Sequence, residues 1–80
     1  MAATITVRYW AGAQRAAGVA QETLPAGSIA DLRASLAARV GFDRLASVVS
    51  FLVDGQHAGE SERPPDGAVV DVLPPFAGGC

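Results

Sequence analysis

The sequence contains no lysine, one cysteine and one histidine among its 80 residues. The absence of lysine excludes a side-chain lysine nucleophile or a Schiff base. A single cysteine cannot form a disulfide within the chain, which fits a reducing cytoplasm. Neither cysteine nor histidine is clustered at the spacing of metal ligands, so we expect no metal site.

The chain also lacks a strong charge of either sign and a long apolar run. Its net charge is −2 and its six arginines are scattered, which disfavours nucleic-acid binding. No apolar run approaches membrane-spanning length, and the first residues do not look like a secretory signal, so we expect a cytoplasmic protein. Eighty residues fit one small domain with little room for an enclosed active site. A carrier or binding role is therefore favoured over self-contained catalysis.

Alternating apolar residues predict strands. In residues 4–10, Ile5, Val7 and Tyr9 alternate with polar residues, so Tyr9 is expected in the core and Trp10 half exposed. We expect further strands at residues 19–24, 48–53, 56–59 and 68–73. The first two strands would form an antiparallel hairpin through a Gly/Ala-rich connection at residues 11–18, and Asp54-Gly55 is a hairpin-turn signal.

Residues 29–40 are predicted to form the one main helix. Its apolar stripe consists of Ile29, Leu32, Leu36 and Val40. Ser28 can cap the helix with Asp31 as its capping-box partner, and Gly41 is well placed to end it in a left-handed conformation. Residues 43–47 fit either a loop or a short turn of helix.

These elements predict an α+β fold, in which a mixed sheet of four to five strands carries one main helix across one face. The first and last strands have the best alternation and the most apolar content, so we place them together at the centre. The acidic residues Glu60, Glu62 and Asp66 fit a solvated loop better than a metal site.

The run from Asp66 to Gly79, DGAVVDVLPPFAGG, resembles the end of the MoaD/ThiS family of ubiquitin-like sulfur carriers. Within that family it is most similar to the small subunit of molybdopterin synthase. The opening VRYWAGAQRAAG is similar to the family's first strand and loop. The resemblance therefore covers nearly the whole chain. It implies a β-grasp fold, with residues 1–80 as a single domain and residues 74–80 as a flexible tail.

The resemblance also implies a chemistry centred on Gly79. A partner activating enzyme uses ATP to adenylate the glycine carboxylate, and a sulfur donor converts it to a thiocarboxylate. A sulfur-accepting synthase, such as the large subunit of molybdopterin synthase, then takes the sulfur. The carrier itself binds no cofactor and is a protein co-substrate rather than an enzyme.

The residues of the tail fit this chemistry independently. Pro74 and Pro75 lack a backbone N–H and end the last strand. Phe76 and Ala77 are expected to dock the tail in a partner. Gly78 and Gly79 have no Cβ, so they fit a narrow channel and allow a nucleophile to approach closely.

Cys80 departs from the family pattern, because the carbonyl of Gly79 remains an amide while Cys80 is attached. In the first interpretation a zinc-dependent peptidase removes Cys80. In the second, the chain resembles the Gly-Gly-Cys product of cysteine-forming carriers. In the third, Cys80 is incidental. A catalytic pair of Cys80 and His57 is disfavoured, because an activated thiol needs a nearby base and His57 is expected on the surface after a turn.

Three alternatives remain open for the function. The carrier could supply sulfur for cysteine, thiamine or a thiolated secondary metabolite instead of molybdopterin. It could be a ubiquitin-like modifier joined to lysines of other proteins through Gly79. It could also be an interaction domain with an inert tail.

Overall fold

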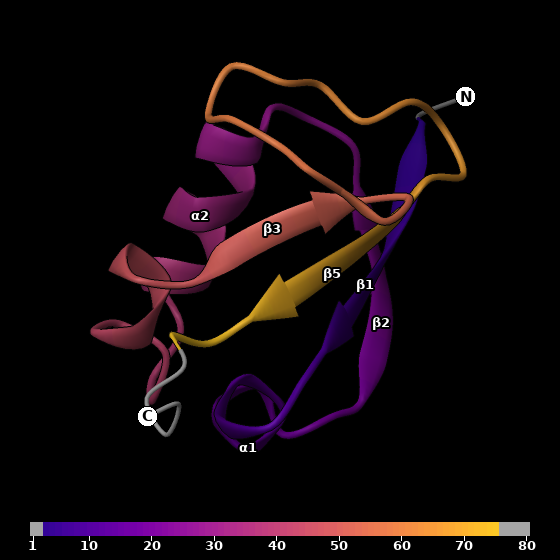
Figure 1. Ribbon diagram of the computed structural model, residues 1–80. Helices are drawn as coiled ribbons and strands as arrows, with labels where there is room; N and C mark the ends of the chain where they lie inside the picture. The colour runs from indigo at the N-terminus through magenta and orange to yellow at the C-terminus, as the bar shows by residue number, and fades with distance from the viewer. Residues whose placement is uncertain (1–2, 76–80) are drawn as a thin grey trace.

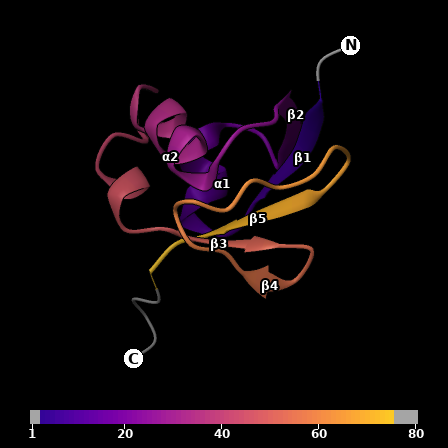
Figure 2. The same cartoon turned by 90° about the horizontal axis from the view of Figure 1, so that it is seen from above.

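The computed structural model describes residues 3–75 and shows one mixed sheet with helices on one face. Figure 1 and Figure 2 show the helices gathered on one side of the strands. The strands are β1 (Thr4–Tyr9), β2 (Gln21–Pro25), β3 (Ser50–Val53), β4 (Gln56–His57) and β5 (Val69–Leu73). The helices are α1 (Gly12–Ala17), α2 (Ile29–Ala37) and the 3-10 turn η1 (Leu45–Ser47). The predicted β-grasp arrangement, a mixed sheet of four to five strands with one main helix across one face, is confirmed, and the sheet has five strands.

The strand order is β2-β1-β5-β3-β4, so the first and last strands are neighbours in the interior of the sheet, as predicted. β1 and β5 run parallel, with Val7 opposite Val70 and Arg8 opposite Asp71. The other pairs are antiparallel. Paired residues lie on the same face of the sheet. This register therefore places Val7 and Val70 against the helices and leaves Arg8 and Asp71 on the outer face.

The core lies between the sheet and α2. Val7, Val70 and Val72 are completely buried, as are Ile29 and Leu36 on the facing side of α2. Ser28 and Asp31 form the predicted capping box, with Asp31 N donating to Ser28 Oγ at 3.0 Å and Ser28 N donating to Asp31 Oδ2 at 3.1 Å. This reciprocal pair satisfies two backbone donors that the first turn leaves free.

The predicted helix end is wrong. α2 stops at Ala37, and Val40 is 98% exposed instead of completing the apolar stripe. Gly41 does adopt a positive φ of 89°, but it turns the chain beyond the helix rather than ending it. The turn places Phe42 in the core, where it is completely buried and takes the position expected for Val40.

The connection at residues 11–18 is also not the simple loop that was predicted. It contains α1, a helix of six residues that buries Ala13 against the core and ends at Gly18 with a φ of 81°. The remaining connections match expectation: Asp54 and Gly55 have positive φ values in a two-residue hairpin turn, and residues 45–47 form a single helical turn. In the part of the chain that the structure describes, no helix has the length and apolar character needed to cross a membrane.

Candidate functional site

The predicted tail begins where β5 leaves the sheet at Leu73. Pro74 is half-buried and Pro75 is exposed, and neither belongs to a strand. The predicted end of the strand at the proline pair is therefore confirmed. The site residues predicted at Phe76, Ala77, Gly78, Gly79 and Cys80 lie outside the described residues, so their roles stay predictions.

The end of β5 is held on both sides. On one side Ser50 of β3 pairs with Leu73. On the other side, the backbone N–H of Trp10, just beyond β1, donates to the carbonyl of Val72 at 3.2 Å. Strands on both sides fix the direction in which the chain leaves the sheet, so the tail starts from a rigid platform.

A shallow hollow surrounds the point where the tail departs. It is lined by Trp10, Ala11, Ser50, His57, Leu73, Pro74 and Pro75. The exposed position predicted for His57 is confirmed, yet β4 places this residue beside the tail prolines rather than at an unrelated site. Sequence reasoning did not find this proximity, because it depends on β3 and β4 lying next to β5 in the sheet.

An ion pair on the outer face of the sheet adjoins this hollow. Arg8 donates from Nε to Asp71 Oδ1 at 2.7 Å and from Nη2 to Asp71 Oδ2 at 3.2 Å. The indole Nε1 of Trp10 donates to the same Oδ1 at 2.9 Å. The guanidinium carbon of Arg8 also lies 5.5 Å from the centroid of the Trp10 ring, within cation–π range.

The charge of Asp71 is stabilised by these donors. The hydrogen bond from Arg8 lowers the pKa of Asp71 below its ordinary value, burial opposes this effect, and the hydrogen bond from Trp10 supports it. Asp71 is 8% exposed and is the only buried polar or charged residue within residues 3–75. The sequence did carry a signal for this site, since Asp71 is the single polar residue in the apolar run AVVDVL.

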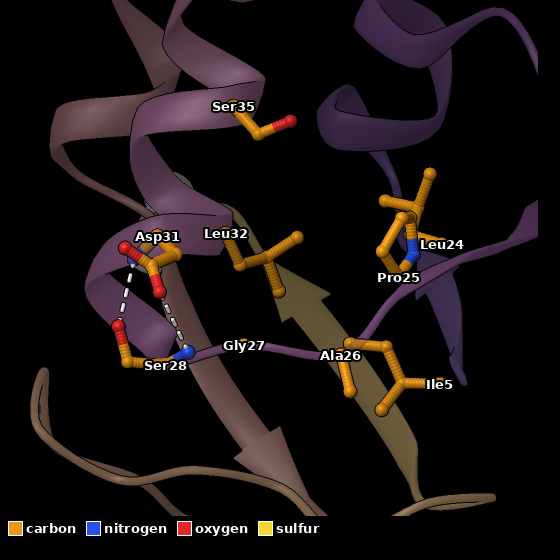
Figure 3. A pocket seen from close by; sticks show the side chains of 9 residues that line it. All are labelled: Ile5, Leu24, Pro25, Ala26, Gly27, Ser28, Asp31, Leu32 and Ser35. Carbon is orange, nitrogen blue, oxygen red and sulfur yellow. Dashed lines mark hydrogen bonds between the residues drawn. The ribbon is translucent and has the colours of Figure 1, made fainter. Parts of the chain in front are cut away.

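A second hollow lies between the end of β2 and the start of α2. Figure 3 shows its lining, with Ile5 and Leu24 on the strand side and Leu32 beside the Ser28–Asp31 pair on the side of α2. The carboxylate of Asp31 is already engaged with the backbone of Ser28. This hollow adjoins the start of β1, whereas β5 ends in front of the proline pair beside the end of β1, so the two places lie at opposite ends of the strand.

Two acidic residues of the 59–67 loop are engaged in hydrogen bonds within the fold. Glu60 binds Arg33 of α2 through Nε and Nη2, at 3.1 and 2.7 Å to its Oε2, and Asp66 accepts from the backbone of Thr4 at 2.9 Å. No group of three or more His, Cys, Asp or Glu side chains within residues 3–75 is placed to hold a metal ion.

Comparison with known proteins shows the family. The ThiS family model matches residues 7–79, so the match ends at Gly79, one residue before Cys80. None of the curated proteins matches the chain by sequence.

Several solved structures share the fold. The HVO 2177 protein of Haloferax volcanii aligns with a TM-score of 0.79 at 26% identity, covering 96% of this chain and 87% of that one. Small archaeal modifier protein 1 of Methanosarcina acetivorans aligns with a TM-score of 0.75 at 20% identity, covering 99% of both chains. A chain from the complex of subunits 1 and 2 of molybdopterin-converting factor from Helicobacter pylori aligns with a TM-score of 0.72 at 22% identity, covering 95% of this chain and 99% of that one. The family match covers residues 7–79, and the β-grasp fold has the expected last strand followed by the proline pair. The chain therefore belongs to the ThiS family.

Proposed function

We propose that this protein is a sulfur carrier whose chemistry takes place on the carbonyl carbon of Gly79. The observation that carries the proposal is the ThiS family match, which extends through Gly79 on a domain whose last strand ends at Leu73, directly before Pro74-Pro75. Members of the family are small carrier proteins rather than catalysts. The protein is accordingly a co-substrate that works in the cytoplasm and binds no cofactor of its own.

The chemistry needs a free carboxylate on Gly79. This carboxylate attacks the α-phosphorus of ATP on a partner activating enzyme and forms an acyl adenylate with release of pyrophosphate. A hydrosulfide nucleophile then attacks the carbonyl carbon, AMP leaves, and a thiocarboxylate remains. Because Gly78 and Gly79 lack a Cβ, the reacting groups can approach without steric hindrance.

Cys80 must leave before these steps, because an amide carbonyl has no free carboxylate oxygen to attack ATP. We propose that a peptidase removes Cys80 and exposes Gly79. The end of the family match at Gly79 supports this order of events.

Molybdopterin synthesis is the pathway we favour for the sulfur. The structural likeness to the molybdopterin-converting factor complex supports this choice, as does the Pro-Pro-Phe-Ala-Gly-Gly tail. By this proposal the acceptor is a second subunit that receives the tail, as the two subunits of that factor form a complex. Thiamine, cysteine and secondary-metabolite pathways are the alternatives for the same thiocarboxylate.

Protein modification is the second candidate function. It is favoured by the likeness to small archaeal modifier protein 1, and the absence of lysine from this chain prevents self-chains linked through its side chains. A modifier would leave Gly-Gly remnants on lysines of target proteins after proteolysis. Such remnants without any thiocarboxylate would favour this function over sulfur delivery.

The test compares three chains that end at Cys80, Gly79 and Gly78. Each is incubated with ATP, hydrosulfide and candidate activating enzymes, and its intact mass is measured. We expect only the chain ending at Gly79 to replace one terminal oxygen by sulfur efficiently. The proposal is wrong if that chain is adenylated by none of these enzymes, and the processing step is wrong if the full chain reacts equally well without losing Cys80.

A further inference from the structure

We propose that Asp71 is a positioning residue, which fixes the exposed indole of Trp10 so that Trp10 anchors the enzyme that adenylates Gly79. The inference rests on the proposed function and deepens it, since it names the surface by which the activating enzyme holds the carrier. Asp71 itself does not touch the reacting atoms.

Trp10 is held in place although it is exposed. This residue is 46% exposed, yet three interactions restrict it: the bond from Nε1 to Asp71, the backbone bond to Val72, and the guanidinium of Arg8 over its ring. Exposed side chains ordinarily sample several rotamers, and ordering them on binding makes the free energy of binding less favourable. Trp10 is thus ordered before any partner arrives.

The ion pair between Arg8 and Asp71 is only partly buried. Asp71 faces outward between Val69 and Leu73, and its cross-strand neighbour on β3 is Leu52. The side chain of Arg8 is 44% exposed, and ion pairs with a solvent-exposed partner usually contribute little to stability. Apolar residues at positions 8 and 71 would therefore serve the fold equally well, whereas they could not accept a hydrogen bond from Trp10.

The network of Arg8, Trp10 and Asp71 lies beside the start of the tail. Gly79 is four residues beyond Pro75, so its Cα can lie no more than about 14 Å from that of Pro75. An active site that holds Gly79 must therefore bring its protein against the start of the tail, where Trp10 and Pro75 line the same hollow. A large aromatic side chain beside an arginine is typical of residues that dominate binding energy.

The experiment uses the chain that ends at Gly79 and the activating enzyme identified by the mass measurement above. Steady-state ATP–pyrophosphate exchange gives kcat and KM for the unsubstituted chain, Asp71→Val, Trp10→Phe and the double variant. We expect Asp71→Val to raise KM about three- to tenfold with little change in kcat, because only the ordering of Trp10 is lost. In the Trp10→Phe background, which has no indole N–H to position, Asp71→Val should change KM little.

Two controls separate positioning from damage to the fold. Thr23→Val makes a similar change on the outer face of β2, away from the tail, and should leave KM unchanged. Urea unfolding of each variant reports stability, and Asp71→Ala, which also has no acceptor for Trp10, replaces Asp71→Val if the valine variant does not fold. Hydrogen exchange of the Trp10 Nε1 proton should accelerate when Asp71 is changed.

The possible outcomes are distinguishable. An unchanged KM in a folded Asp71→Val chain overturns the inference and leaves the proposed function standing. An equal rise in KM with and without the Trp10→Phe substitution also overturns it, because Asp71 would then contact the enzyme directly. If the unsubstituted chain is not adenylated at all, the proposed function fails and the inference fails with it.

Discussion

The hydroxyl of Tyr9 donates a hydrogen bond of 2.5 Å to Glu22 Oε2 across the β1–β2 hairpin, on the helix side of the sheet. Arg39, just beyond α2, donates to the same oxygen at 2.6 Å. Burial and the bond to Glu22 both raise the pKa of Tyr9. For Glu22, burial pushes the pKa upward, but the donors Arg39 and Tyr9 more than offset it, and the pKa is lowered. One carboxylate thus ties the hairpin to the chain that follows the main helix.

Removing the hydroxyl of Tyr9 should therefore destabilise the domain. Tyr9→Phe keeps the ring in the core beside Phe42, whose centroid lies 5.9 Å away, but removes one donor to Glu22. We expect the free energy of unfolding to fall by about 1 to 2 kcal/mol, because a hydrogen bond to a charged acceptor is lost. Urea denaturation measures the change. An unchanged midpoint would show that Arg39 alone satisfies the carboxylate.

The second prediction concerns Arg33, which joins three parts of the fold. Its Nη1 donates to the carbonyls of Ala46 at 2.7 Å and Val49 at 3.1 Å, while the rest of the guanidinium holds Glu60. Arg33→Lys keeps the charge, but an ammonium cannot reproduce this fork of donors. We expect a loss of about 1 to 2 kcal/mol in the free energy of unfolding.

Arg44→Lys is the matched control for Arg33→Lys. Arg44 is exposed on the loop before η1, so the same substitution there should change stability by less than about 0.5 kcal/mol. Equal effects at both positions would contradict the role given to Arg33. Chemical denaturation of the two variants under identical conditions makes the comparison.

The third prediction compares Leu36 and Val40, the last two residues of the apolar stripe expected from the sequence. Leu36 is completely buried, so Leu36→Ala should cost about 2 to 5 kcal/mol by removing core contacts and leaving a cavity. Val40 is 98% exposed, so Val40→Ala should change stability by less than about 0.5 kcal/mol. Thermal unfolding of both variants tests this contrast. A large effect at Val40 would mean that the helix continues to residue 40 in solution.

The fourth prediction concerns pH. Partners hold the pKa values of four carboxyl groups below their ordinary values: Glu22, Asp31, Glu60 and Asp71. Each is therefore more easily deprotonated in the folded state than in the unfolded chain. The stability that they contribute is fully present above the unfolded pKa of about 4, and it is lost as the pH falls through the lower pKa values of the folded state.

We expect the free energy of unfolding to be nearly constant from about pH 7 to about pH 5 and to decrease from there to about pH 2. Urea titrations at a series of pH values measure this slope. Asp71→Asn removes one of the four groups and should make the slope below about pH 5 shallower. A slope that is identical in the Asp71→Asn variant would contradict the lowered pKa of Asp71.

Much of the fold could be predicted because its signals are local. The alternation of Ile5, Val7 and Tyr9, the Ser28–Asp31 capping box and the Asp54-Gly55 turn each depend on a few adjacent residues, and each is present in the structure. The short helix α1 had no such signal. Its apolar face consists only of alanines, Ala13, Ala16 and Ala17, and a helix of six residues is not stable unless the rest of the fold holds it.

The sequence by itself determined the strands, the main helix, their buried faces and the position of the proline pair, because side-chain spacing and proline chemistry act over short distances. It also carried the family resemblance of the tail. Only the tertiary structure decided which apolar residue completes the core after α2, where Phe42 replaces Val40. Only the tertiary structure, likewise, brought Arg8 and Trp10 to Asp71 across separations of 63 and 61 residues. Parallel pairing of β1 with β5 sets that contact, and pairing between distant strands depends on the packing of the whole sheet rather than on either strand alone.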